Sequence, residues 1–93
     1  MTTNIIHSAI ITCYLATGNP CSNGHYPTPH HTIAGPRCYP LGSDVYIGTN
    51  HYILEDRTAR KYNGRWDVFV SCSKEEALRI GKQTNNITII TKL

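Results

Sequence analysis

Hydrophobic and polar residues alternate over several short stretches of the chain, which is the pattern of half-buried β-strands. Other stretches lack strict alternation but are rich in β-branched and aromatic residues, which also favour strands. We predict six strands, at residues 4–14, 32–35, 44–48, 51–56, 66–71 and 86–93.

Two regions between the predicted strands have a different character. In residues 73–83, Ser73 can cap a helix, Glu75 and Glu76 favour its first turn, and Leu78 and Ile80 supply an apolar stripe. We predict a short helix there that ends near Gly81. Residues 15–31 contain three Pro, two Gly and two Asn and predict a long ordered loop, whose Tyr26 and histidines can line a groove.

Six strands and one helix in 93 residues predict a single domain, residues 1–93, in the mainly β class. A small closed barrel is favoured over a sandwich, because closure removes sheet edges. The four cysteines lack a CxxC spacing, so neither a zinc ribbon nor a redox dithiol is expected. Cys21 and Cys38 flank the same long loop, and we predict a disulfide between them.

The chain carries nine Lys and Arg against six Asp and Glu, and all of them lie from Arg37 onward. A modest basic excess suits an acidic polymer such as a bacterial cell wall. A nucleic-acid partner is not expected, because no run of Lys or Arg would follow a phosphate backbone.

No segment is long and apolar enough to span a membrane, and the first residues lack the basic region of a signal peptide. We expect a soluble monomer that acts outside the cell or in the cell wall, either as a mature form or as a phage-delivered protein.

The candidate chemistry lies in residues 55–69, which bring Asp56 and Asp67 to the ends of two predicted strands. By strict alternation Asp56 shares a face with Tyr52 and Leu54, and Asp67 shares one with Phe69. A carboxyl group beside apolar residues has a raised pKa and can serve as a general acid. The alternative is an ordinary hairpin closed by Asn-Gly, with aspartates that only bond to the backbone.

Three pieces of the chain, in order, resemble a known family. They are IITCY at 10–14, YPLGSDVYI at 39–47 and EDRTARKYNGRWDVF at 55–69, followed by the predicted helix and closing strand. Over about residues 9–92 the chain resembles the 3D domain. That domain occurs at the C-terminal end of MltA-type lytic transglycosylases and in small cell-wall proteins of Gram-positive bacteria and phages. The resemblance implies a six-stranded double-psi β-barrel, related to expansins and RlpA-like proteins.

The same resemblance implies that Asp67 is the catalytic acid/base in cleaving peptidoglycan glycan strands and that Asp56 is its partner. It also implies groove contacts from Thr12, Tyr14, Thr58, Tyr62 and Arg65, and it requires no cofactor. The chain departs from the family pattern in two places. The first of the three aspartates falls at Gly35, and a Gly-Gly pair is replaced by Thr58-Ala59.

Several alternatives stay open. The aspartate pair also suits a hydrolytic muramidase, and the barrel also suits an expansin-like module that binds glycan without cutting it. A zinc site from Cys21, His25, His30 and His31 has suitable ligand types, but adjacent histidines on an extended stretch seldom point the same way, so no metal is predicted. A cysteine nucleophile is disfavoured for lack of a cationic environment, except at Cys72 near the helix start.

Overall fold

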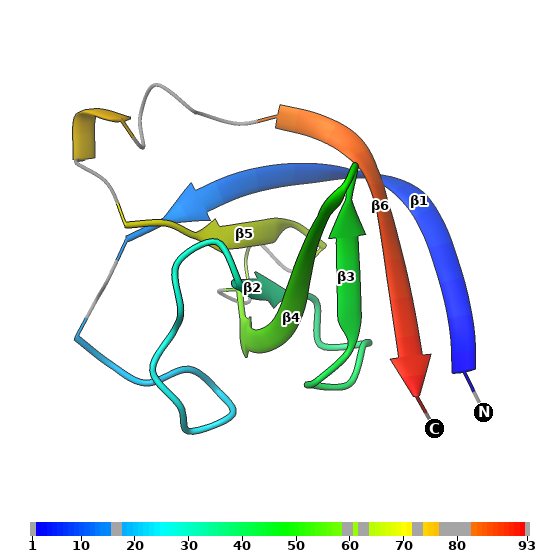
Figure 1. The fold of residues 1–93 in the computed structure, drawn as a ribbon, viewed down its shortest axis with the longest axis horizontal. Coiled ribbons are helices and arrows are strands. Elements are labelled where there is room, and N and C mark those ends of the chain that lie inside the picture. Colours follow the sequence, from blue (N-terminus) through cyan, green and yellow to red (C-terminus); the bar gives the residue numbers. More distant parts are fainter. Residues whose placement is uncertain are drawn as a thin grey trace.

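In the computed structural model six strands close into one barrel (Figure 1). The structure describes residues 2–15, 18–58, 61, 64–71, 74–76 and 83–92. The strands are β1 (Thr2–Tyr14), β2 (Thr32–Gly35), β3 (Asp44–Ile47), β4 (Asn50–Arg57), β5 (Trp66–Phe69) and β6 (Gln83–Lys92). Residues 74–76 are helical, and the remainder of the predicted helix lies outside the described residues. The predicted mainly β barrel with a short helix near the C-terminus is confirmed.

Around the barrel the strand order is β1-β5-β2-β4-β3-β6, and β6 pairs with β1 to complete the ring. Two neighbouring pairs, β1 with β5 and β2 with β4, are parallel, and the other four are antiparallel. Parallel strands cannot be joined by a tight turn, so the chain must cross between distant positions of the barrel. This arrangement fits the predicted double-psi barrel.

The strands β4 and β5 follow each other along the chain but do not pair. Instead β2 lies between them, parallel to β4 and antiparallel to β5. The alternative interpretation of this region as an ordinary hairpin is therefore wrong. The insertion of β2 also sets the spacing of the two aspartates.

The interior of the barrel is filled by apolar side chains from all six strands. Trp66 is fully buried, and its ring packs against Tyr39 with the ring centroids 5.6 Å apart. Full burial of each large side chain contributes roughly 1.5–3 kcal/mol. The buried core residues are Ala9, Ile11, Ile33, Val45, Tyr52, Leu54, Trp66, Val68, Val70, Ile87 and Ile89.

The first and last strands form the longest pairing of the barrel. Thr2 lies opposite Lys92 at one end of this ladder, and Ile11 lies opposite Gln83 at the other. The start of β1 and the end of β6 consequently lie side by side (Figure 1).

Candidate functional site

Asp56 and Asp67 lie on two strands that flank the same neighbour. In the strand register Ala34 of β2 is opposite Asp67 of β5 on one side and opposite Asp56 of β4 on the other. Adjacent strands are about 4.8 Å apart, so the two aspartate Cα atoms are separated by roughly 10 Å. Residues in one row of a sheet point to the same face, which directs both side chains to one side of the wall.

A bulge in β4 brings Asp56 to this face. Ile33 is opposite Leu54 but the next residue, Ala34, is opposite Asp56, so Glu55 is an extra residue in β4. Ile33 and Leu54 are fully buried in the core, whereas Ala34, also buried, lies outside the core cluster and lines a cavity with both aspartates. The prediction that Asp56 shares a face with Leu54 is therefore wrong, because the bulge interrupts the alternation on which it rested.

The two carboxylates line one cavity of about 180 Å³ on the outer surface of the barrel. Tyr14 enters it from the end of β1, and Thr58 follows β4 at its edge. The long β1–β2 loop contributes to the rim. The described lining residues are Tyr14, Asn19, Pro27, Ala34, Asp56, Arg57, Thr58 and Asp67.

Asp67 is half-buried in the middle of β5. Burial raises the pKa of its carboxyl group above the ordinary value of 3.8, and the nearby cation of Arg65 opposes this shift in part. Desolvation disfavours the charged form, so the pKa moves in the direction a general acid requires.

Asp56 is held by three hydrogen bonds that converge on one carboxylate oxygen. The backbone N–H and the hydroxyl of Ser22 donate to Oδ1 at 3.0 and 2.9 Å, and the backbone N–H of Arg57 donates at 2.9 Å. These bonds fix the direction of the side chain and tie it to the β1–β2 loop. Asp56 is thus a positioned carboxylate, in an environment unlike that of Asp67.

Glu55, the bulged residue, anchors the same loop. Its carboxylate accepts hydrogen bonds from Asn23 Nδ2 at 2.9 Å and from Thr32 Oγ1 at 2.7 Å, and its backbone carbonyl accepts one from the Asn23 N–H. His31 Nε2 lies 3.9 Å from the carboxylate. The bulge therefore orients Asp56 and holds the loop beside it.

Tyr14 and Cys21 form a protonated pair next to the aspartates. The Tyr14 hydroxyl is buried beside the Cys21 thiol and makes no hydrogen bond of ordinary geometry with the other residues that the structure describes. Burial raises the pKa of Tyr14, and the neighbouring Cys21, Asp56 and Asp67 raise it further. Burial also raises the pKa of the Cys21 thiol, and Asp56 and Glu55 add to the shift. Tyr14 can thus donate to a bound oxygen, whereas Cys21 is poorly suited to act as a thiolate nucleophile.

Arg57 also lines the cavity, and two hydrogen bonds hold its side chain. Its Nη1 donates to the carbonyl oxygens of Pro36 at 2.6 Å and Tyr39 at 2.7 Å, which ties the end of β4 to the β2–β3 loop. The sequence reasoning missed Ser22, Cys21 and Arg57 as members of this site. Their residue types alone do not indicate a site. Ser22, for example, is 34 positions from Asp56 and meets it only once the loop is folded.

The other predicted groove residues differ in where they lie. Tyr14 and Thr58 line the cavity with the aspartates. Thr12 is opposite Asp67 in the β1–β5 ladder but lines a different cavity, and Arg65 acts on Asp67 through its charge. Tyr62 lies outside the described residues.

The predicted disulfide between Cys21 and Cys38 is wrong, because both thiols are free in the structure. Cys21 is buried beside Tyr14 and Asp56, whereas Cys38 is exposed in the β2–β3 loop next to Tyr39. Flanking the same loop in sequence did not bring them together. Among the residues that the structure describes, no cluster of His, Cys, Asp and Glu has a geometry able to hold a metal ion.

Gly35, where the resemblance to the 3D domain implied an aspartate, has no room for a side chain. A Cβ atom there would lie 2.5 Å from Cζ3 of Trp66 and 3.0 Å from Cδ1 of Leu54. A carboxylate at this position would point into the core and away from Asp56 and Asp67. The site is consequently built on two aspartates.

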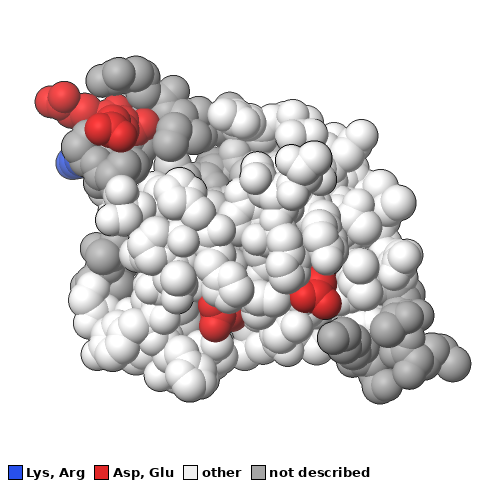
Figure 2. Space-filling view, viewed as in Figure 1, with Lys and Arg blue, Asp and Glu red and all other residues white. Residues whose placement is uncertain are grey.

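Charged side chains are sparse on the face drawn in Figure 2, where small acidic groups are separated by uncharged surface. Among the described residues this face has no strip of Lys and Arg. The described residues also include no helix with the length and apolar character needed to cross a membrane.

Comparison with known proteins identifies no relative. No protein-family model matches the chain, and neither does a curated protein or a solved structure. The geometry of the cavity and the motif resemblance therefore carry the functional argument.

Proposed function

We propose that the protein cleaves peptidoglycan glycan strands in the manner of a lytic transglycosylase, with Asp67 as the acid/base. The observation that carries this proposal is the shared cavity. Two carboxylates from different strands converge there in unlike environments, one partly desolvated and one held by three hydrogen bonds. Two carboxyl groups in unlike environments are typical of sites in which one acts as the general acid and the other stabilises charge.

In the proposed reaction protonated Asp67 donates its proton to the oxygen that links N-acetylmuramic acid to N-acetylglucosamine. The bond between that oxygen and C1 of the muramic acid breaks, and positive charge develops on the ring. The Asp67 carboxylate then takes the proton of the C6 hydroxyl while the oxygen of that hydroxyl attacks C1. The products are a 1,6-anhydro sugar and a free hydroxyl, and Asp67 regains its proton.

The other cavity residues have supporting roles in this proposal. The Asp56 carboxylate, with its orientation fixed by Ser22 and Arg57, stabilises the positive charge on the ring. The Tyr14 hydroxyl donates a hydrogen bond to a sugar oxygen, which supplies the acceptor that this buried group lacks among the described residues. The cavity is smaller than most small-molecule sites, so it would hold the reacting sugar while the strand continues outside it.

The test is incubation with purified peptidoglycan followed by mass analysis of the soluble products. Anhydro-muropeptides are expected, and products with reducing ends would assign the pair to a hydrolytic muramidase instead. Binding without soluble products would assign the barrel to a non-catalytic, expansin-like module.

Asp67→Asn should lower product release by about 100-fold or more, the usual contribution of a general acid. The matched control is Asp44→Asn, because Asp44 lies on β3 and pairs with His51 away from the cavity. Release that survives in Asp67→Asn removes Asp67 from the proposed role. Equal loss in both variants would indicate damage to the fold.

A further inference from the structure

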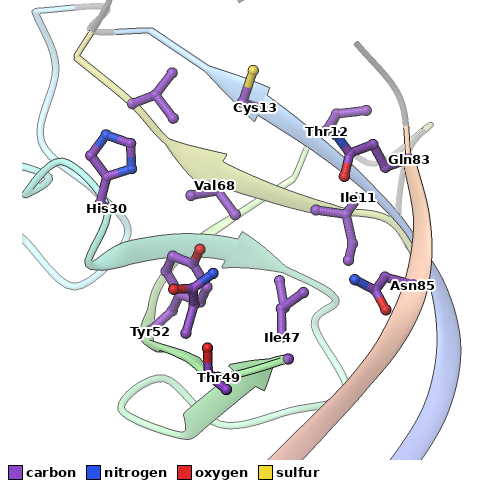
Figure 3. Close-up of a pocket in the computed structure, with 13 residues that line it drawn as sticks. Ile11, Thr12, Cys13, His30, Ile47, Thr49, Tyr52, Val68, Gln83 and Asn85 are labelled. Atoms are coloured by element: carbon purple, nitrogen blue, oxygen red, sulfur yellow. The ribbon is translucent and has the colours of Figure 1, made fainter. Parts of the chain in front are cut away.

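A second and larger cavity opens at one mouth of the barrel, with a volume of about 430 Å³. Its walls come from β1, β5, β6 and the β3–β4 turn (Figure 3). This volume lies within the range of about 300–1,000 Å³ that is usual for small-molecule sites, which often occupy barrel mouths. The two cavities share no described lining residue, although β1 and β5 contribute neighbouring residues to both.

The inward-facing positions of β6 explain why this mouth is open. Ile89 and Ile87 are fully buried, but the next two residues on the same face, Asn85 and Gln83, are exposed. The strand therefore changes from isoleucine to amides as it leaves the core. In Figure 3 Asn85 projects from β6 toward Ile11 and Ile47.

The wall of the cavity is mostly apolar, and its polar groups are hydroxyls, amides, the Cys13 thiol and the His30 imidazole. Ile11, Ile47 and Val68 form the wall, and Thr49, Gln83 and Asn85 supply hydroxyl and amide groups at the rim. Asp, Glu, Lys and Arg are absent from the described lining residues. A charged ligand would lose hydration there, and no Asp, Glu, Lys or Arg of the described lining would offset that loss.

Tyr52 adds a specific polar group to this wall. It is 8% exposed, and its hydroxyl makes no hydrogen bond with another described residue. Burial is the one cause that raises the pKa of Tyr52, so the hydroxyl keeps its proton. It therefore offers a hydrogen-bond donor to the cavity, and a ligand that displaces water from this wall must supply the acceptor.

We propose that this mouth is a second binding site, for a small uncharged molecule with an apolar body and a carbonyl group that accepts a hydrogen bond from Tyr52. The rim amides would pair with a neutral polar end of the same molecule. The inference does not depend on glycan cleavage, because none of its residues belongs to the aspartate cavity.

The experiment uses two probes that differ in one charge, N-acetyl-phenylalanine amide and N-acetyl-phenylalanine. Each is titrated into isotope-labelled protein up to its solubility limit, and amide NMR shifts are followed. The neutral amide should shift the side-chain signals of Gln83 and Asn85 and the backbone signals of Ile11 and Val68. The signals of Ser22 and Asp56 should not move, and the carboxylate probe should bind at least ten-fold more weakly.

Two variants test the assignment. Tyr52→Phe keeps the ring and should weaken binding by about two- to ten-fold, the range of one hydrogen bond. Thr49→Trp, in the exposed turn, should block the mouth without entering the core. An unchanged spectrum away from the mouth shows that each variant is folded. The proposal is overturned by an absence of shifts at the mouth, by equal binding of the two probes, or by full binding to Tyr52→Phe.

Discussion

Replacing Gly35 with alanine tests how tightly the wall behind the two aspartates is packed. The added Cβ would lie 2.5 Å from Cζ3 and 2.6 Å from Cε3 of Trp66, whereas ordinary contacts begin at 3.4 Å. The indole must therefore retreat by about 1 Å. Trp66 is fully buried and its ring packs against Tyr39.

The expected free-energy cost has two parts of opposite sign. Over-packing a core costs roughly 1–3 kcal/mol. Gly35 does not need a positive φ, so alanine also lowers the entropy of the unfolded chain, which stabilises the fold by about 0.4–1 kcal/mol. We expect a net loss of roughly 1–2 kcal/mol, or a fall in Tm of roughly 4–16 °C for a domain of this size.

The assay is urea denaturation followed by circular dichroism, repeated in a Trp66→Leu background. Circular dichroism is needed because Trp66 is the only tryptophan. With the indole removed, most of the penalty should disappear, because only the 3.0 Å contact with Cδ1 of Leu54 then opposes the entropic gain. A penalty of equal size in both backgrounds, or no penalty in the native one, would show that the indole does not restrict this position.

Three further predictions concern the site and its loop. Asp67→Asn should be more stable than the native protein near neutral pH, because the folded protein has a raised pKa at Asp67 and so binds more protons than the unfolded chain. The Asp67 carboxyl group should make the native protein less stable as pH rises above about 3.8. The difference in free energy of unfolding between the two proteins should therefore disappear in acid. Urea titrations at several pH values measure this difference, and a difference that grows on acidification would contradict the prediction. Thr32→Val removes the hydroxyl that joins the Thr28 N–H to Glu55, and should cost about 1–3 kcal/mol by urea denaturation, whereas a neutral result would mean that water replaces the hydroxyl. Cys38→Ser should change stability by less than about 0.5 kcal/mol, and a loss of about 2–4 kcal/mol that disappears under reducing conditions would reveal a disulfide.

The strands could be predicted from the sequence because their signals are local. Alternation in β3, β4 and β5 and the β-branched residues of β1 and β6 indicate where each strand lies, and the count of six favours closure. The resemblance implied groove contacts from Thr12 and Tyr14, and in the structure Thr12 pairs with Asp67 while Tyr14 lines the aspartate cavity.

The remaining features depend on contacts between distant residues. Nothing local indicates that β2 inserts between β4 and β5, and this insertion removes the hairpin alternative. The extra residue Glu55 cannot be recognised from alternation, because a bulge is defined by the partner strand. The disulfide prediction failed for a related reason, since the loop folds Cys21 toward Asp56 and leaves Cys38 at the surface.

The pairing of β6 with both β1 and β3 has a consequence for synthesis on the ribosome. Until β6 emerges, the barrel lacks one strand, and β1 has no partner along most of its length. Residues 2–14, which form β1, contain no Lys, Arg, Asp, Glu or Pro to discourage pairing with other chains. The barrel therefore cannot close before β6 has been synthesised, and until then β1 is exposed to pairing with other chains.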